Sequence, residues 1–338
     1  MGKPIGILYE HPEWFKPLFA TLDRRGLPYE PIHAEAHHYN PSALTAPYSL
    51  VVNRVSASSF LRDHGQAILY ARQYLDHLET IGVPVLNGLR AFELDLSKAR
   101  QLSLMTKLGL PHPRSRVANS VEQVEAAANE LEYPIIVKPN LGGSGALMRR
   151  FDSHDELRAA VADGQVAPIL GIDTTAIVQE FHQTRGSIVR VEALADRFLY
   201  GIRIHNGASQ NFNLCPADIC QTPDGATDAA PSIAAVPAED DLDFCPVDAP
   251  ALRQLQIEAT DPPQWVIDGV LDIFRSSGVD VGGVEYLESE RDGQIYLYDV
   301  NSLSNFVTDA VNLVGFDPFE RLVDHIARRA GLLEPAAV

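Results

Sequence analysis

A lysine and a glycine-rich loop follow directly from an apolar run near the middle of the chain. Ile135-Ile136-Val137-Lys138-Pro139 is β-branched and apolar, and Gly142, Gly143, Ser144 and Gly145 come after it. Such a run is typical of a buried strand, and Pro and Gly mark the turn where it ends. A fixed cation beside a loop of exposed backbone N–H groups is suited to bind phosphate oxygens. This segment therefore predicts a phosphate-binding site.

A second group of polar residues lies on a predicted hairpin near the C-terminus. Residues 281–287 and 294–300 resemble strands, and Arg291-Asp292-Gly293 fits the turn between them. This register places Glu285 opposite Asp299, and Asn301 shares a face with Asp299 because it lies two residues further along. Two carboxylates and an amide are oxygen ligands suited to Mg²⁺. Each residue taken singly also fits a solvated strand position, so the prediction depends on all three.

The elements that must position these groups alternate along the first part of the chain. Strands are expected at 5–9, 50–53 and 83–86, and helices at 14–25 and 66–81, which indicates a small parallel sheet. Capping boxes place two further helices on either side of the Lys138 strand, and the strand around Ile177–Phe181 completes an α+β unit. From residue 188 the pattern is antiparallel. An amphipathic helix is expected at 317–330.

Composition restricts the class of protein. The chain has 338 residues, 46% of them hydrophobic and 21% charged, which fits a globular protein of two or three domains. A net charge of −18 argues against a nucleic-acid partner. We expect no transmembrane helix and no signal peptide, and hence a cytoplasmic protein. The three cysteines have no paired motif that would indicate zinc.

Together, the Lys138 strand, its glycine loop, the strand Val178-Gln179-Glu180-Phe181 and the Glu285/Asp299-Val300-Asn301 strands resemble the ATP-grasp superfamily. The similarity is to glutathione-synthetase-like carboxylate–amine ligases and covers about residues 97–328. It implies two α+β subdomains that clamp ATP, after a small parallel-sheet domain. The expected division is 1–96, 97–180 and 181–338, with a Pro- and Asp-rich insertion at 221–250 that is either an ordered lid or disordered.

The resemblance also implies roles for single residues. ATP would be bound by the lysines and glycine loop and by the hinge, and Mg²⁺ by the hairpin. Lys98 and Lys138 match the phosphate-binding lysines, although Lys98 alone also fits an exposed helix residue. Glu180 and Phe181 match the adenine hinge, where Glu180 fits a structural role equally well. Arg190 and Arg203 match catalytic cations that face the γ-phosphate and the acyl-phosphate intermediate, although each alone fits a surface strand residue equally well. Glu285, Asp299 and Asn301 match the metal ligands, and Asn301 is also expected to be catalytic.

The implied reaction joins a small-molecule or peptide carboxylate to an amine through an acyl phosphate, with release of ADP and phosphate. Two alternatives remain open: a phosphotransferase of the same fold, and a nucleotide-binding module without turnover. A homodimer is also open. The chain departs from the family pattern where Glu285 precedes Asp299, where Ile188 stands two residues before Arg190, and after Asn301.

Overall fold

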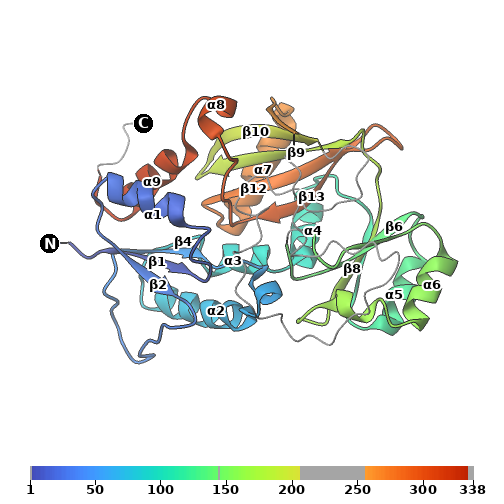
Figure 1. The fold of residues 1–338 in the computed structure, drawn as a ribbon, viewed down its shortest axis with the longest axis horizontal. Helices are drawn as coiled ribbons and strands as arrows, with labels where there is room; N and C mark the ends of the chain where they lie inside the picture. Colours follow the sequence, from blue (N-terminus) through green and yellow to red (C-terminus); the bar gives the residue numbers. More distant parts are fainter. Residues whose placement is uncertain (1, 144, 206–255, 334–338) are drawn as a thin grey trace.

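The computed structural model describes residues 2–143, 145–205 and 256–333. Ser144, the 221–250 insertion and the three cysteines lie outside these residues. The described strands form three sheets, which Figure 1 shows as separate layers with helices packed on and between them. Among the described residues, no helix is both long and apolar enough to cross a membrane.

The first sheet is parallel, as the sequence predicts. It has the order β2-β1-β3-β4, from β1 (Ile5–Tyr9), β2 (Tyr29–His33), β3 (Leu50–Arg54) and β4 (Val85–Leu86). β1 and β3 are almost continuously buried, as expected of inner strands covered on both faces. β2 is missing from the prediction because Glu30 and Pro31 interrupt its apolar pattern, which is tolerated at the edge of a sheet.

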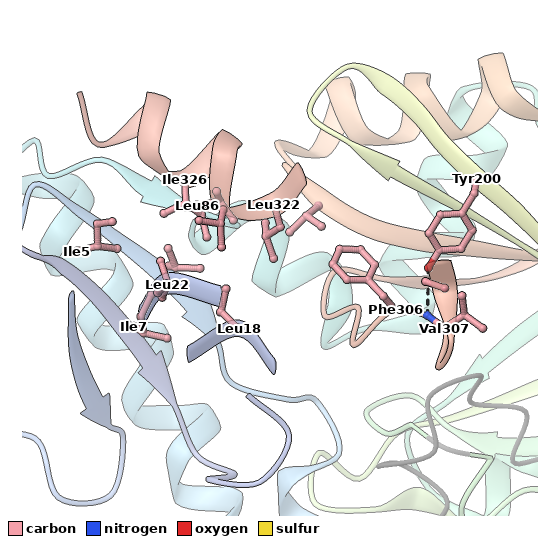
Figure 2. Close-up of a cluster of buried hydrophobic side chains, with 14 of the residues drawn as sticks. Ile5, Ile7, Leu18, Leu22, Leu86, Tyr200, Phe306, Val307, Leu322 and Ile326 are labelled. Atoms are coloured by element: carbon pink, nitrogen blue, oxygen red, sulfur yellow. Dashed lines mark hydrogen bonds between the residues drawn. The ribbon is translucent and has the colours of Figure 1, made fainter. Parts of the chain in front are cut away.

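The helices that cover this sheet come from both ends of the chain. η1 (Ser59–Arg62) and α2 (Gly65–Thr80) belong to one face, whereas α1 (Lys16–Arg24) and α9 (Pro318–Arg329) cover the other. Figure 2 shows Leu322 and Ile326 of α9 over the sheet. Their cluster is continuous with apolar residues of the C-terminal sheet, where the Tyr200 hydroxyl accepts a 3.2 Å hydrogen bond from the Val307 N–H.

The second sheet has the order β5-β8-β6-β7 and antiparallel pairing. Its strands are β5 (Ser115–Ala118), β6 (Ile135–Pro139), β7 (Arg149–Phe151) and β8 (Ala176–Glu180), and its helices are α5 (Val121–Ala128), α6 (His154–Ala162) and η2 (Ala167–Leu170). Ile135, Val137 and Val178 pack with α5 and α6 in one core. Because side chains alternate along a strand, Lys138 projects from the other face.

The third sheet is antiparallel, with the order β11-β10-β9-β12-β13. Its strands are β9 (Ser187–Leu194), β10 (Arg197–His205), β11 (Gln256–Ala259), β12 (Val281–Glu288) and β13 (Ile295–Asn301). α7 (Gln264–Ser277) packs on one face, and the remaining helices are α3 (Leu89–Asp95), α4 (Lys98–Lys107) and α8 (Ala310–Val314). The predicted hairpin turn is confirmed, since Gly293 has a φ of 69°.

Candidate active site

The register of the third sheet brings three charged residues onto one face. Arg190 pairs with Glu285, and Glu285 pairs with Asp299, as the sequence predicts for the two carboxylates. Glu285 is held at both oxygens: Arg190 Nη1 donates to Oε1 at 3.0 Å, and the Tyr298 hydroxyl donates to Oε2 at 2.8 Å. Asn301 Nδ2 donates to Asp299 Oδ2 at 3.3 Å. The two carboxylates and the amide therefore form one group.

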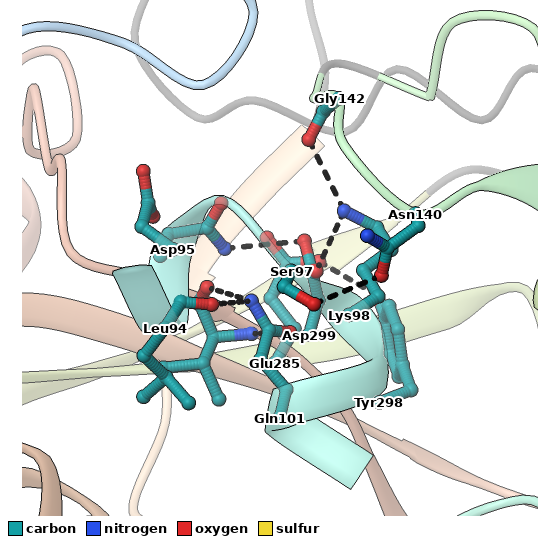
Figure 3. A network of polar contacts seen from close by, with 12 residues as sticks. Leu94, Asp95, Ser97, Lys98, Gln101, Asn140, Gly142, Glu285, Tyr298 and Asp299 are labelled. Atoms are coloured by element: carbon teal, nitrogen blue, oxygen red, sulfur yellow. Dashed lines mark hydrogen bonds and ion pairs between the residues drawn. The ribbon is translucent and has the colours of Figure 1, made fainter. Parts of the chain in front are cut away.

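Lys98 reaches this group from the first turn of α4. Ser97 caps the helix by accepting the Arg100 N–H, which fixes the turn. Lys98 Nζ lies 3.4 Å from Asp299 Oδ1 and donates to the carbonyl of Gly142 at 3.1 Å (Figure 3). Its side chain is only 11% exposed, so it is not a solvated helix lysine.

Lys138 enters from the second sheet and is 2% exposed. Burial and the neighbouring charge of Lys98 lower its pKa to about 8, although Asp299 and Glu285 act in the opposite direction. Within the described residues it makes no hydrogen bond or ion pair. A buried ammonium without a partner is costly, so this nitrogen is suited to an anion that enters between the two sheets.

The two carboxylates are in different electrostatic states. Burial raises the pKa of Glu285 above its ordinary value, because the attraction of Arg190 does not fully compensate. Burial acts on Asp299 too, but Lys98 and Lys138 outweigh it and lower its pKa. Asp299 therefore stays ionised, and its Oδ1 accepts no hydrogen bond.

Three residues that the sequence analysis does not single out support this group (Figure 3). Asp95, at the end of α3, accepts the Ser302 N–H at 2.7 Å, and burial raises its pKa to about 6. Gln101 bonds both backbone groups of Val300. Asn140 accepts from the Ala99 N–H at 2.9 Å and so holds the start of α4 against the end of β6. Their only sequence signal is proximity to Lys98 and Lys138.

Arg190 belongs to a longer polar chain. Its Nε donates to Glu192 Oε1 at 2.6 Å, and Ser304 Oγ donates to the same oxygen at 2.9 Å. A Cβ on Gly283 would lie 2.7 Å from both Arg190 Nε and Glu192 Oε1. A glycine is required there because the two side chains lie directly over β12.

Arg203 does not join the site. It pairs with Val189, whereas Arg190 pairs with Ile202, so Arg203 projects from the opposite face of the sheet. There it donates to Ser187 Oγ at 3.2 Å and lies 3.7 Å from Glu258. Because side chains alternate along a strand, Arg203 and Arg190 lie on opposite faces of the sheet, which is not the shared placement that the resemblance implies.

The hinge residues are engaged within the protein. Glu180 Oε1 accepts from Arg114 Nη1 at 3.1 Å and from the Glu132 N–H at 3.0 Å. The Phe181 N–H donates to the Pro134 carbonyl at 2.9 Å, and the Arg150 guanidinium lies 4.6 Å from its ring centre. The Glu180 carboxylate thus has structural partners, which is one of the two expected roles.

The glycine loop lies against the N-terminal sheet. A Cβ on Gly143 would lie 3.4 Å from Ser58 Cβ, and one on Gly142 would lie 3.4 Å from Pro139 Cγ. Gly145 has a φ of 68°, which favours glycine. Gly142 and Gly143 thus lie between the end of β6 and the residues around η1, and Lys98 donates to the Gly142 carbonyl.

The donor set fits a hard cation shared with phosphate. Among the described residues, no cluster of three or more His, Cys, Asp or Glu side chains could hold a metal ion by itself. Oxygen ligands for Mg²⁺ could come from Asp299 Oδ1, which accepts no hydrogen bond, from the Glu285 carboxylate and from the Asn301 amide. Oxygens of a bound ligand would have to complete the coordination shell of the ion.

Comparisons with known proteins find similar sequences and a similar fold. A sequence family described as the carbamoyl-phosphate synthase L chain, ATP binding domain, matches residues 97–206. The D-alanine--D-alanine ligase of Ectopseudomonas mendocina (strain ymp) is 41% identical over 87 residues, 25% of this chain and 28% of that relative. The chain thus matches just over a quarter of the length of this curated relative.

Longer matches have lower identity. D-alanine--D-alanine ligase B of Xanthomonas campestris pv. campestris is 29% identical over 259 residues, 73% of this chain and 69% of the relative. Among solved structures, the ligase PsnB complexed with minimal precursor superposes with a TM-score of 0.63 at 18% identity, covering 97% of this chain and 99% of that one. The two proteins share a fold.

Proposed function

We propose that this chain, which has the ATP-grasp fold, is an ATP-dependent ligase that joins a carboxylate to an amine and releases ADP and phosphate. The observation that carries the proposal is the buried Lys138, which lies near Lys98 and Asp299 but makes no hydrogen bond or ion pair with any residue that the structure describes. A triphosphate supplies the missing anion. The relatives named as D-alanine--D-alanine ligases support the same type of reaction.

The residues would divide the work as follows. Lys98 and Lys138 bind phosphate oxygens, and the Gly142–Gly145 loop closes over them and excludes water. Glu285, Asp299 and Asn301 hold Mg²⁺, which neutralises charge on the phosphates when bound. Arg190, oriented by Glu192, offers its guanidinium to the phosphoryl group during transfer. We assign no role in this step to Arg203.

The proposed substrates are a small-molecule or peptide carboxylate and an amine. A screen of amino acids and small carboxylates for ADP release, with mass spectrometry of the products, tests the reaction type. A ligase yields free phosphate and an amide. A stable phosphorylated product instead contradicts the ligase and identifies a phosphotransferase, and the absence of ADP release with every substrate contradicts both.

The role of Lys138 has its own test. Lys138→Met keeps the apolar stem but removes the charge, and should weaken ATP binding at least about tenfold. Calorimetric titration of the full chain with MgATP measures this effect. The matched control is Lys107→Met, at the exposed end of α4, which should bind ATP normally. Equal affinity in wild type and Lys138→Met contradicts the phosphate-binding role.

A further inference from the structure

A buried asparagine next to the first sheet is bonded to the strands that carry the proposed metal ligands. Asn87 lies between β4 and α3, is 1% exposed and has a φ of 51°. This left-handed conformation is uncommon outside glycine, and asparagine tolerates it better than most residues do. Its side-chain amide is directed at the third sheet, about two hundred residues further along the chain.

The Asn87 amide uses its whole hydrogen-bonding capacity. Its Oδ1 accepts from the backbone N–H groups of Asp280 at 2.7 Å and Val281 at 3.2 Å. Its Nδ2 donates to the carbonyl of Val281 at 2.8 Å and to that of Ser302. An asparagine side chain has two N–H donors and one oxygen with two lone pairs, so every site is engaged. Such a complete set fixes the backbone on both sides of the amide.

These bonds lie at the open end of the hairpin formed by β12 and β13. A turn joins the two strands at one end, and at the other end their last paired residues are Gly283 and Asn301. Just beyond this pair, Asn87 connects Ser302 to Val281 at the start of β12. Strand ends fray readily when no group binds their backbone. Asn87 therefore secures the end of the hairpin that lies opposite its turn.

Ser302 directly follows the proposed ligand Asn301 and is held on both sides. Its N–H donates to Asp95 Oδ1 at 2.7 Å, its carbonyl accepts from Asn87, and it is 4% exposed. A shift of Ser302 would carry Asn301 with it, because the two residues are adjacent. Metal sites require their ligands to be held within about 0.5 Å of the productive geometry. The bonds to Ser302 are therefore placed to control that geometry.

Asn87 is itself anchored through Asp280. The Asn87 N–H donates to Asp280 Oδ2 at 3.2 Å, and the other carboxylate oxygen is bonded by Arg329 Nη1 of α9. His325 Nε2, also on α9, lies 3.6 Å from the same oxygen. An amide held from behind in this way can fix the position of Ser302, whereas a mobile one could not.

We propose that Asn87 is a positioning residue for metal binding, which holds the end of β13 so that Asn301 and Asp299 keep their places as ligands. It does not touch the ion or the nucleotide itself. The inference rests on the proposed function, because Mg²⁺ bound together with ATP is what the hairpin would hold. Asparagine suits this role because aspartate would set an acceptor against the two carbonyls, and alanine would keep the strained φ without any bond.

Binding of Mn²⁺ tests this role without catalysis. Mn²⁺ favours the same oxygen ligands as Mg²⁺, and electron paramagnetic resonance measures the unbound ion when the full chain is titrated with a non-hydrolysable ATP analogue present. Asn87→Gly removes the amide and adopts the φ without strain. It should weaken Mn²⁺ binding at least about tenfold, as loss of a supporting contact behind a metal ligand usually does. Unchanged Mn²⁺ affinity in the folded variant overturns the proposal.

Two further variants separate positioning from a general loss of stability. Asn87→Asp keeps the acceptor for β12 but cannot donate to the Ser302 carbonyl. It should also weaken Mn²⁺ binding at least about tenfold, and it gives the same test if Asn87→Gly does not fold. Leu75→Ala, fully buried in α2, is the destabilised control and should keep the wild-type Mn²⁺ affinity. Equal weakening in Leu75→Ala overturns the proposal, because loss of stability then explains the effect.

The readouts separate this inference from the proposed function. If Mn²⁺ binding falls in Asn87→Gly but no substrate gives ADP release in the wild type, the ligase is contradicted and the positioning role stands. If ADP and an amide form, but Asn87→Gly needs no more Mg²⁺ than the wild type for half-maximal rate, the ligase stands and the positioning role is contradicted. If the wild type binds no Mn²⁺ with the nucleotide, the metal assignment and this inference both fail.

Discussion

At the scale of single residues, the site buries three positively charged side chains and two carboxylates close together. Lys98, Lys138 and Arg190 face Glu285 and Asp299, and only some of these charges are in direct contact. The negative charge of Asp299 raises the pKa of Lys138 and so favours its charged state, which is the state that binds phosphate. Replacing it should therefore alter function more than packing.

Asp299→Asn should lower the rate of ADP release by at least about two orders of magnitude, because a neutral amide is a poor ligand for Mg²⁺ and removes a charge opposite the lysines. The protein should remain folded, since the substitution is nearly isosteric. A steady-state assay of ADP release, with circular dichroism, measures both. Asp272→Asn, on an exposed part of α7, is the matched control. Wild-type activity in Asp299→Asn contradicts the metal assignment.

Asp95 gives a prediction for pH dependence. Burial raises its pKa from 3.8 to about 6, so the folded protein binds its proton more tightly than the unfolded chain. Below pH 4 both states are protonated and the group has no effect. As the pH rises from about 4 to about 6, the folded state loses up to about 3 kcal/mol of stability through this residue.

Asp95→Asn removes that dependence. Urea denaturation at pH 4.5 and pH 7.5 should show the variant gaining stability relative to wild type at the higher pH. The difference between the two proteins cancels the other titrating groups that they share. A constant difference in unfolding free energy across this range shows that Asp95 does not titrate as described.

At the scale of elements, strand register explains which side chains meet. The alternation of two residues per repeat predicts that Glu285, Asp299 and Asn301 share a face, and the pairing confirms this placement. The same alternation excludes Arg203, which sequence similarity alone assigned to the site. The face on which Arg203 lies follows from the pairing of β9 with β10, and a linear sequence motif carries no information about that pairing.

Other elements of the fold can also be predicted from local sequence patterns. Strands with continuous apolar runs, and helices ended by glycine, follow the sequence closely. β5, β7 and β11 are short and carry mixed residues, so only their partners make them strands. Asp95 and Gln101 act through contacts with Ser302 and Val300, about two hundred residues away, and no local pattern encodes such contacts.

Gly283 in β12 leaves the space that the Arg190 and Glu192 side chains occupy over the strand. Gly283→Ala should displace Arg190 and Glu192, because the new methyl group would lie 2.7 Å from each, at a cost of about 1–3 kcal/mol and most of the activity. Gly293→Ala, at the hairpin turn, meets no atoms within 4 Å but is strained by its φ of 69°. It should lose about 1–2 kcal/mol and keep its activity. Equal loss of activity in both variants argues against a positioning role for Gly283.

At the scale of the whole molecule, one hydrophobic core joins segments that are far apart along the chain. The division at residues 96 and 180 stays a prediction. The core that covers one face of the first sheet contains Leu18 and Leu22 of α1 together with Leu322, Val323 and Ile326 of α9. Arg25 strengthens this junction with ion pairs to Glu320 at 2.9 Å and Asp324 at 2.7 Å. The two ends of the chain therefore share one core.

Ile326→Ala should destabilise the protein by about 2–5 kcal/mol, because it leaves a cavity between α9 and the first sheet. Trp14 and Trp265 are the only tryptophans in the sequence. Trp14 lies just before α1, next to the first sheet, and Trp265 lies in α7, on the third sheet, so single-tryptophan variants report each part separately. In Ile326→Ala, the unfolding midpoints reported by the two tryptophans should fall together. Val311→Ala, at a 58% exposed position, should change stability by less than about 0.5 kcal/mol. A shift confined to one reporter contradicts the shared core.

The position of α9 also has a consequence for how the chain is made. Ribosomes synthesise proteins from the N-terminus, and domains usually fold in that order at about 5–20 residues per second. Here β1 and β3 emerge long before Leu322, Val323 and Ile326, with which they share a core. One apolar face of the nascent sheet thus stays open to solvent or to a chaperone until α9 has been synthesised. A chain that stops before α9 leaves that apolar face exposed, which makes it prone to aggregate.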